Sequence, residues 1–212
     1  MRLDEKLLEG LKPQDSPILH FYDFEGAAAT YGYFLKPELF LNERHGLDLA
    51  RRPTGGGILF HLWDLTFSVL IPEGHFGYSK EVMRNYRFIN DLVVIGISNY
   101  LGISVVNLLP EDPLPLDEAS GHFCFAKPTK YDVMMDGKKV AGAAQRRKKN
   151  GFLHQGSISL IMPDFAYLQT LLRPDTLVLN AMKMHTFAIA QGNLTDAKNG
   201  LRASLQKVIT QI

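Results

Sequence analysis

A single cysteine follows a long proline-rich segment of the sequence. It is Cys124, in the row Gly121-His122-Phe123-Cys124-Phe125. On an extended backbone, the side chain of His122 would point to the same side as that of Cys124. A nearby imidazole or ammonium group lowers the pKa of a thiol and makes it a nucleophile, whereas a free cysteine without such neighbours is commonly a small buried hydrophobic residue. Because Cys124 comes directly after a long loop, we interpret it as a candidate catalytic nucleophile.

Three consecutive glycines form a second candidate site. Without Cβ atoms, Gly55, Gly56 and Gly57 let their peptide N–H groups come close to an anion or a carbonyl oxygen. The row lacks the GxGxxG of dinucleotide-binding loops and the GK[ST] of Walker loops. A tight turn explains three glycines equally well, but Arg51 and Arg52 directly before them favour a phosphate or carboxylate site.

Lys139 lies at the start of a predicted strand that is rich in small residues. Strand alternation places Lys139, Ala141 and Ala143 on one face, and small side chains beside a lysine leave room for a ligand over the sheet. An exposed lysine at a turn is the competing interpretation, and the local pattern alone favours it.

The remaining candidates are a histidine and a run of cations. His61 ends the strand that follows the glycines, where a structural role is more common than a catalytic one. The seven histidines show neither HxxxH nor HExxH spacing, so no metal site is predicted. The run from Arg146 to Lys149 occupies a predicted hairpin tip, either as a solvated turn or as a surface for an acidic partner.

Composition limits what kind of protein can carry these residues. The chain has 212 residues, 46% of them hydrophobic and 21% charged, which suits a single globular domain over residues 1–212. With 23 Lys and Arg against 22 Asp and Glu, the net charge of +1 gives no basis for a nucleic-acid-binding or membrane-surface protein. A single cysteine excludes an intramolecular disulfide, and we find neither a signal peptide nor a membrane-spanning run, so we expect the cytoplasm as location.

Hydrophobic periodicity and turn residues indicate the elements that position the candidates. Asp136-Gly137 and Asn150-Gly151 are hairpin turns between β-type runs, and they predict a three-stranded meander. Ser79 is the expected N-cap of the longest helix, which ends before Gly102, and Thr195 is the expected cap of the last helix. Further strands are expected at 18–24 and 28–34, around a turn at 25–26, and at 58–61 and 65–71, and further helices at 3–11, 37–42 and 164–172.

The predicted strands cluster without a regular βαβαβ alternation. We therefore expect an α+β fold with mostly antiparallel sheets and flanking helices. Residues 108–121 contain three prolines and four acidic residues, and they are expected to form a long surface loop. Neither an internal repeat nor a linker divides the sequence.

Together these motifs resemble the lipoate ligase and octanoyltransferase superfamily, whose relatives include the biotin protein ligases. The resemblance covers about two thirds of the chain, and the order and spacing of the motifs agree as well as the residue types. Its residues run from Arg51-Arg52-Pro53-Thr54-Gly55-Gly56-Gly57-Ile58-Leu59-Phe60-His61 to Ser68, and then from Cys124 through Asp132 and Gly137-Lys138-Lys139-Val140-Ala141-Gly142-Ala143-Ala144-Gln145-Arg146 to His154-Gln155-Gly156-Ser157.

The resemblance implies a biotin/lipoate ligase-like catalytic domain that attaches octanoate or lipoate to one lysine of a lipoyl domain. It implies Cys124 and Lys139 as the catalytic residues. By the same resemblance, the substrate-binding residues are Arg52, Gly55, Gly56, Gly57, His61, Gly142, Ala143, His154 and Gly156.

Members of this superfamily follow two routes, and the sequence resembles the second. Ligases use ATP to form an acyl adenylate, whereas octanoyltransferases take the acyl group from acyl carrier protein or from another lipoyl domain through a cysteine thioester. The row Cys124-Phe125-Ala126-Lys127-Pro128-Thr129-Lys130-Tyr131-Asp132 resembles the cysteine motif of one transferase branch, with Lys139 placed 15 positions after Cys124 as in that branch. Ligases typically have an Asn-Asp pair where Tyr131-Asp132 stands, and we expect no accessory C-terminal domain of the kind that many ligases carry.

The resemblance therefore implies an acyl carrier protein or a lipoylated protein as donor, with no cofactor, nucleic acid or membrane involved. The implied acceptor is a lipoyl domain of the glycine-cleavage H protein or of a 2-oxoacid dehydrogenase. Two alternatives stay open. An ATP-dependent lipoate ligase would use ATP and Mg²⁺, with Lys139 holding the acyl adenylate, and a catalytically silent relative would only bind lipoyl domains or acyl carriers.

Overall fold

A computed structural model of the chain describes residues 1–113, 120–174, 177–190 and 192–212. Its α-helices are α1 (Arg2–Gly10), α2 (Val82–Leu101), α3 (Phe165–Leu171), α4 (Val178–His185) and α5 (Leu194–Ile209). Its strands are β1 (Ile18–Tyr22), β2 (Ala28–Tyr31), β3 (Asp48–Arg51), β4 (Leu59–Phe60), β5 (Asp64–Pro72), β6 (Asn107–Leu108), β7 (Val133–Met135), β8 (Lys138–Lys148) and β9 (Gly151–Ser159). Short 3-10 helices span Pro37–Leu39 and Ser120–His122. Part of the predicted surface loop at 108–121 lies outside the described residues.

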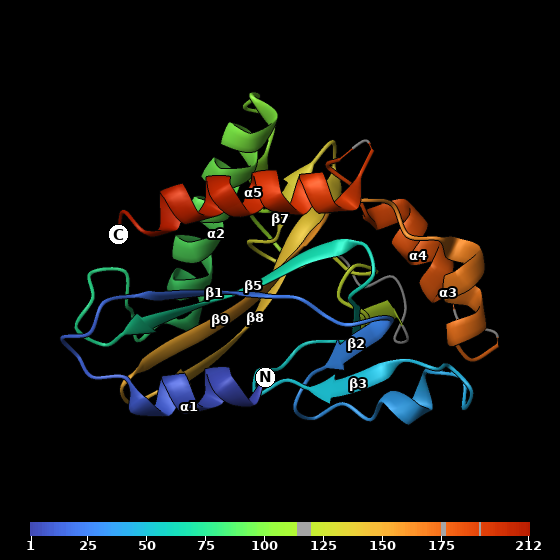
Figure 1. The fold of residues 1–212 in the computed structure, drawn as a ribbon, viewed down its shortest axis with the longest axis horizontal. Helices are drawn as coiled ribbons and strands as arrows, with labels where there is room; N and C mark the ends of the chain where they lie inside the picture. The colour runs from blue at the N-terminus through green and yellow to red at the C-terminus, as the bar shows by residue number, and fades with distance from the viewer. Residues whose placement is uncertain (114–119, 175–176, 191) are drawn as a thin grey trace.

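The strands form two sheets (Figure 1). The larger has six strands in the order β1-β5-β9-β8-β7-β6, and every neighbouring pair is antiparallel. The smaller has the order β3-β2-β4, in which β2 and β3 are parallel. The prediction of an α+β fold with mostly antiparallel sheets is thus confirmed. The strands expected on either side of the turn at 25–26 do not pair with each other, because β1 joins the larger sheet and β2 the smaller.

Strand β5 separates two layers of side chains because it is buried on both faces. Phe67 and Val69 face the main core, which lies under the crossed helices α2 and α5 (Figure 1). The alternate residues Thr66, Ser68 and Leu70 point to the opposite face. Leu70 packs there against α1, Ser68 donates to Asp4 of the same helix (3.2 Å), and Thr66 lies 2.9 Å from His61 Nδ1. The larger sheet therefore presents an apolar face to α2 and a partly polar opposite face, part of which α1 covers.

A second core joins the smaller sheet to helices α3 and α4. Helix α4 was not predicted, since its eight residues are too few for a clear helical period. It buries Val178, Ala181 and Met182, and this tertiary packing stabilises a helix that its own sequence would not. Phe60 of β4 and Phe123 lie in the same core.

Two predicted helix caps are wrong. Helix α2 begins after Glu81, and the side chain of Asn85 binds the backbone N–H and C=O of Ser79, so Ser79 is not the N-cap. Helix α5 begins after Asn193, whose side chain accepts a hydrogen bond from the N–H of Thr195. Both predictions named a suitable residue type within two positions of the observed cap, which is the usual uncertainty of helix ends.

The turn residues stand where the sequence predicts them. Gly102 ends α2 in the left-handed conformation, with φ 69°. Asp136 and Gly137 both have positive φ, 51° and 72°, as a type I′ hairpin turn requires between β7 and β8. Asn150-Gly151 joins β8 to β9. The predicted meander of three strands is confirmed.

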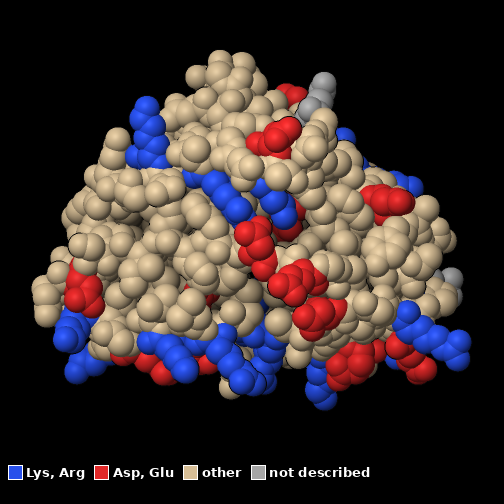
Figure 2. All heavy atoms as spheres, viewed as in Figure 1, with Lys and Arg blue, Asp and Glu red and all other residues tan. Residues whose placement is uncertain are grey.

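The surface carries charges of both signs. Figure 2 shows Lys and Arg interspersed with Asp and Glu on one face of the molecule, many of them along the lower edge of that view. Among the residues that the structure describes, no helix is long and apolar enough to cross a membrane.

Candidate active site

A pocket opens where the two sheets and the segment around Cys124 meet, and we call it the Cys124 pocket. Its space between atoms, open solvent included, is about 390 Å³. The first residue of the chain reaches it, because α1 begins at this point (Figure 1). Its lining residues are Met1, Thr30, Arg52, Gly56, Gly57, Leu59, His61, Thr66, Cys124, Gly142, Ala143, Ala144, Gln155 and Gly156.

The floor of the Cys124 pocket consists of small and polar side chains on the larger sheet. Thr66 of β5 pairs with Ser157 of β9, which pairs in turn with Gly142 of β8. Two positions along the strands, Gln155 pairs with Ala144. Alternation places all five on the face opposite the α2 core. Their small side chains leave space over the sheet for a ligand.

Cys124 lies in a turn that is tied to the strand after the glycines. The N–H of Ile58 donates to the carbonyl of His122 (2.7 Å), and the N–H of Cys124 donates to the carbonyl of Ile58 (3.0 Å). His122 belongs to a 3-10 helix, and its ring packs against Phe40 at 4.6 Å. The expectation that an extended backbone directs His122 and Cys124 to the same side is therefore wrong. His122 does not line the Cys124 pocket.

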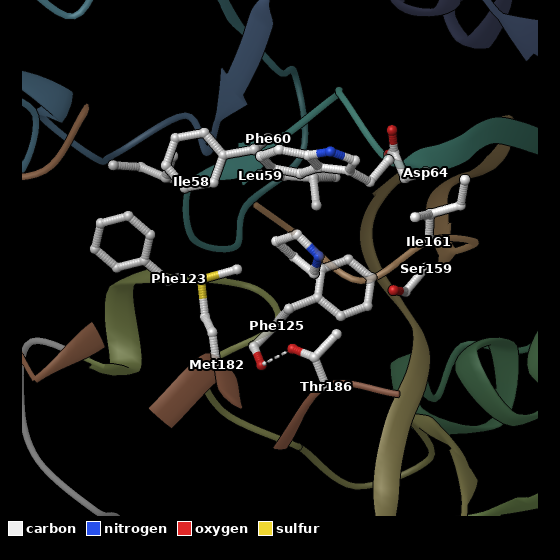
Figure 3. Close-up of a pocket in the computed structure, with 12 residues that line it drawn as sticks. Ile58, Leu59, Phe60, Asp64, Phe123, Phe125, Ser159, Ile161, Met182 and Thr186 are labelled. Atoms are coloured by element: carbon white, nitrogen blue, oxygen red, sulfur yellow. Dashed lines mark hydrogen bonds between the residues drawn. The ribbon is translucent and has the colours of Figure 1, made fainter. Parts of the chain in front are cut away.

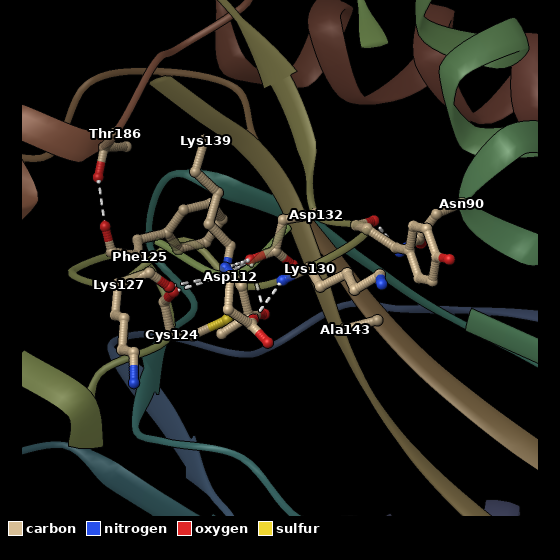
Figure 4. A network of polar contacts seen from close by, with 12 residues as sticks. Asn90, Asp112, Cys124, Phe125, Lys127, Lys130, Asp132, Lys139, Ala143 and Thr186 are labelled. Atoms are coloured by element: carbon tan, nitrogen blue, oxygen red, sulfur yellow. Dashed lines mark hydrogen bonds and ion pairs between the residues drawn. The ribbon is translucent and has the colours of Figure 1, made fainter. Parts of the chain in front are cut away.

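Lys139 is buried behind Cys124, with 3% of its surface exposed. Its Nζ donates to the carbonyl oxygens of Cys124 (2.7 Å) and Lys127 (3.4 Å), and it forms an ion pair with Asp132 (2.7 Å; Figure 4). Burial favours the neutral amine, but the charges of Asp132 and Cys124 outweigh it, and the pKa of Lys139 is raised. The Lys139 side chain runs directly over Gly142, where an added Cβ would lie 2.4 Å from Lys139 Cε. A larger residue at position 142 would displace the lysine side chain.

A bulge in β8 explains the direction that Lys139 takes. Val133 pairs with Ala141 whereas Met134 pairs with Lys139, so β8 contains one extra residue at this point. The bulge breaks the alternation from which Lys139, Ala141 and Ala143 were expected on one face. That expectation is wrong, because the lysine side chain crosses the glycine at 142 instead.

Arg52 determines the shape of the glycine loop. Its Nη2 donates to the carbonyl oxygens of Gly57 (2.6 Å) and Gly55 (3.2 Å). The carbonyl of Gly55 and the N–H of Gly56 belong to one trans peptide, in which C=O and N–H point in opposite directions. Because this carbonyl accepts from Arg52, the N–H of Gly56 is directed away from the arginine. Gly56 itself has φ +85°, a conformation that favours glycine. Burial, the largest influence, lowers the pKa of Arg52, and the nearby charge of Cys124 opposes this shift.

The glycines differ in how tightly they are packed, and this predicts different outcomes for two alanine variants. A Cβ on Gly57 would lie 2.3 Å from the carbonyl oxygen of His122, whereas a Cβ on Gly55 would meet no atom within 4 Å. We expect Gly57→Ala to lower the free energy of unfolding by about 1–3 kcal/mol, since the turn that carries Cys124 must move. Gly55→Ala is the matched control, and we expect it to unfold within about 0.5 kcal/mol of the wild type. Denaturant titration of both variants checks the prediction, which equal stabilities would contradict.

His61 belongs to a buried hydrogen-bonded network beneath Arg52. Asp64 can only accept, so Nδ1–H of His61 donates to its carboxylate (3.0 Å). Arg52 Nη1 donates to Thr30 Oγ1 (2.6 Å), which also lies within hydrogen-bonding distance of His61 Nε2 (2.7 Å). Thr66 also donates to Asp64 (2.8 Å). The network orients Arg52, and through it the glycine loop. Within the described ranges, no group of three or more His, Cys, Asp or Glu is arranged to hold a metal ion.

The pKa of Asp64 predicts how this network responds to acid. Burial favours the protonated acid, but the charge and hydrogen bonds of its neighbours outweigh burial, so the pKa is lowered. The stabilisation is therefore complete above the ordinary pKa of about 3.9 and is lost as the pH falls toward the folded-state value. We expect the difference in unfolding free energy between the wild type and Asp64→Asn to be largest above about pH 4 and to shrink below it. Denaturant titrations at pH 3 to 7 measure this difference, and a constant value would contradict the prediction.

Helix α1 is connected to the glycine loop by buried side chains. Nε2 of Gln155 donates to the carboxylate of Asp4 (2.8 Å), and Thr54 Oγ1 donates to Oε1 of Gln155 (2.8 Å). Asp4 is completely buried and also contacts His20 Nδ1 (3.0 Å). Gln155 thus positions Thr54, the residue directly before the three glycines.

Most of the residues expected at the site lie together. Eight of them line the Cys124 pocket, namely Arg52, Gly56, Gly57, His61, Cys124, Gly142, Ala143 and Gly156. Gly55 instead borders a neighbouring surface groove, and Lys139 lies behind the cysteine. His154 faces the α2 core, where its Nδ1 lies 2.7 Å from Nε2 of Gln145. Burial lowers the pKa of His154 to about 3. His154 therefore does not line the pocket in the way expected of a substrate-binding residue.

Sequence reasoning missed several residues that shape the pocket. Gln155 was overlooked in favour of its neighbour His154, and only the strand register shows which of the two faces the pocket. Thr30 and Asp64 join the network of His61 from positions that no motif marks. Leu59 stands within the glycine motif but carried no chemical signal.

The basic run at the β8–β9 hairpin is partly neutralised within the chain. Arg146 pairs with Glu5 (2.8 Å), and Lys148 pairs with Glu9 of the same helix. Two of its cations therefore connect β8 to α1. The sequence had suggested either a solvated turn or a surface for an acidic partner.

Comparison with known proteins agrees with this arrangement. The family model for the lipoyl protein ligase A/B catalytic domain matches residues 1–212. The chain belongs to this family. An octanoyltransferase LipM from Geobacillus kaustophilus is 37% identical over 171 residues, covering 76% of this chain and 60% of that protein. One from Anoxybacillus flavithermus is 32% identical over 206 residues, covering 92% of this chain and 74% of that protein. The chain thus spans about 60% of the length of the first of these relatives.

Solved structures show the same fold for this lipoyl ligase A/B domain. A lipoate-protein ligase A bound with ATP superposes with a TM-score of 0.71 at 23% identity, over 97% of this chain and 78% of that chain. A bi-partite lipoate protein ligase from Thermoplasma acidophilum, studied with its E2 lipoyl domain, gives 0.69 at 23% identity, over 97% and 76% of the two chains. At these identities the likeness concerns the fold.

Proposed function

We propose that this chain is an acyltransferase that moves an octanoyl or lipoyl group to a lysine of a lipoyl domain through an acyl-enzyme on Cys124. The observation that carries the proposal is the position of the thiol. Cys124 lines the same pocket as Gly56 and Gly57, while the ammonium of Lys139 binds its backbone carbonyl. Relatives named octanoyltransferase LipM, at 32–37% identity, support this reading. The proposed reaction takes place in residues 1–212 as one catalytic domain.

The first step forms a thioester on the enzyme. The thiolate of Cys124 attacks the carbonyl carbon of the donor thioester, a new S–C bond forms, and the bond to the donor sulfur breaks. The donor thiol leaves as a thiolate and takes a proton from water. Lys139, whose Nζ binds the carbonyl of Cys124, and Arg52, which lines the same pocket, are the cations proposed to assist the attack. The N–H of Gly56, directed away from Arg52, is the proposed donor to the oxygen that gains charge.

The second step transfers the acyl group to the acceptor. The lysine amine of a lipoyl domain attacks the Cys124 thioester, an amide forms, the amine proton passes to solvent, and Cys124 leaves as a thiolate. The proposed donors are acyl carrier protein or a lipoylated protein, and no cofactor takes part. The hydrocarbon chain lies over Gly142, which has no side chain, and Ala144, which has only a methyl group. These two residues leave the space that the chain needs. A reactive free thiol requires reducing conditions, so we propose the cytoplasm as location.

Intact mass spectrometry tests the proposal directly. The protein is mixed with octanoyl acyl carrier protein without ATP, and a lipoyl domain is added afterwards. We expect an octanoyl adduct on the protein that disappears as the lipoyl domain gains the same mass. Modification that requires ATP and free lipoate would identify an ATP-dependent ligase instead. Binding of the lipoyl domain without any modification would identify a silent relative.

A further inference from the structure

A second cavity lies next to the Cys124 pocket, and the proposed reaction does not use it. It lies among β4, the turn at 123–125 and helix α4 (Figure 3), and its space between atoms of about 390 Å³ includes open solvent. Most of its lining is apolar, with aromatic rings on several sides. The lining residues are Ile58, Leu59, Phe60, Trp63, Asp64, Phe123, Phe125, Ser159, Ile161, Pro163, Met182 and Thr186.

Two polar side chains of this second cavity form hydrogen bonds within the protein. The carboxylate of Asp64 accepts hydrogen bonds from Thr66 (2.8 Å) and Ser157 (2.7 Å). The hydroxyl of Thr186 donates to the carbonyl of Phe125 (3.2 Å; Figure 3). Most of the other lining side chains are aromatic or aliphatic. Such a lining fits a hydrocarbon chain.

The two spaces share one lining residue. Along the strand after the glycines, Gly57 and His61 line the Cys124 pocket, whereas Ile58 and Phe60 line the second cavity. Of the residues that the structure describes, only Leu59 lines both. Leu59 is 7% exposed, and it is the residue at which the two linings meet.

We propose that the second cavity is a hydrocarbon-binding site, and that Leu59 limits the acyl chain by closing the passage to it from the Cys124 pocket. With Leu59 in place, the chain carried on Cys124 ends over the small residues of β8. With a shorter side chain at position 59, a longer acyl chain passes through and its methyl end packs among Phe60, Phe123 and Met182. The inference rests on the proposed function for the acyl-enzyme, and adds the residue that selects chain length.

A competition experiment tests the role of Leu59. Wild type, Leu59→Val and Leu59→Ala are each mixed with equal amounts of octanoyl and dodecanoyl acyl carrier protein, and the two adducts are compared by intact mass spectrometry. We expect the ratio of dodecanoyl to octanoyl adduct to rise about tenfold or more in Leu59→Ala, because four further methylenes become buried. Leu59→Val, which removes one methylene, should lie between. An unchanged ratio in both variants would overturn the inference.

Met182→Phe supplies the control from the far side of the second cavity. Met182 does not line the Cys124 pocket, so the single variant should load octanoate as the wild type does. Added to Leu59→Ala, it narrows the space for the longer chain, and the adduct ratio should return toward the wild-type value. Persistence of the raised ratio in the double variant would show that the chain does not enter this cavity.

Binding of free dodecanoate is measured by calorimetry on four of these proteins, namely wild type, Leu59→Ala, Met182→Phe and the double variant, and it tests the cavity separately from the acyl-enzyme. We expect tighter binding to Leu59→Ala than to wild type, and loss of that gain in the double variant. If no protein forms an adduct, the proposed function fails while the calorimetry still decides the role of the cavity. Equal dodecanoate binding by all four proteins would overturn the cavity inference alone.

Discussion

Cys124→Ala is expected to abolish acyl loading, lowering the transfer rate by at least about a thousand-fold, because no other group in the pocket can form the thioester. The chain contains no second cysteine, so any thioester adduct of the wild type reports on this residue alone. The loss should be chemical and not structural. Cys124 is only partly buried, its turn is held by backbone hydrogen bonds, and alanine retains them.

The measurement compares wild type, Cys124→Ala and Cys124→Ser in the same loading assay, with denaturant unfolding of each protein alongside. We expect unfolding free energies within about 1 kcal/mol of one another. Serine keeps the size of the side chain but is a weaker nucleophile at neutral pH, so its adduct should also be absent or very slow. Transfer at the wild-type rate by Cys124→Ala would exclude the cysteine route.

Lys139→Met is expected to have the largest effect on stability. It removes the partner of Asp132, which is 3% exposed, and leaves a buried carboxylate that accepts hydrogen bonds from the backbone N–H and the hydroxyl of Thr129. Breaking one half of a buried ion pair lowers the free energy of unfolding by about 3–5 kcal/mol. Because the pKa of Lys139 is raised, its contribution is complete below the ordinary lysine pKa of about 10.4, and is lost only as the pH rises through the folded-state value. Burial raises the pKa of Asp132 even beside Lys139, so without the lysine the buried carboxyl takes up a proton as the pH falls, and the deficit should be largest at high pH and shrink toward low pH.

The double variant Lys139→Met with Asp132→Asn separates the buried charge from the chemistry. Asparagine keeps an acceptor for Thr129 but carries no charge, so most of the lost stability should return. Acyl loading should stay low, because the ammonium beside Cys124 is still missing. Full recovery of loading in the double variant would show that Lys139 acts on stability alone, and an unfolding curve of Lys139→Met equal to that of the wild type would contradict the ion-pair argument.

Local chemistry explains which parts of the fold could be predicted. The hairpin turns at 136–137 and 150–151 need residues that adopt positive φ, and such residues are visible in the sequence. Helix α4 escaped prediction because its stability comes from burying Val178, Ala181 and Met182 against other elements. Partners in a sheet likewise depend on distant segments, which is why β1 and β2 joined different sheets.

At the candidate site, too, the sequence indicated some features, and others depended on contacts between distant segments. The residue types and their order indicated Cys124, the glycine loop and Lys139, and the family match to residues 1–212 agrees with that resemblance. A strand pattern alone could not show that Gln155 rather than His154 faces the pocket, because a shift of one residue exchanges the two faces.

The sequence by itself therefore determined the chemical groups, the local turns and the family of this protein. Only the tertiary structure decided the directions of its side chains. The bulge in β8 turns Lys139 across Gly142 to the carbonyl of Cys124, and Leu59 lines both cavities. The physical reason is that direction within a strand depends on register and bulges, which are set by contacts between segments far apart in the chain.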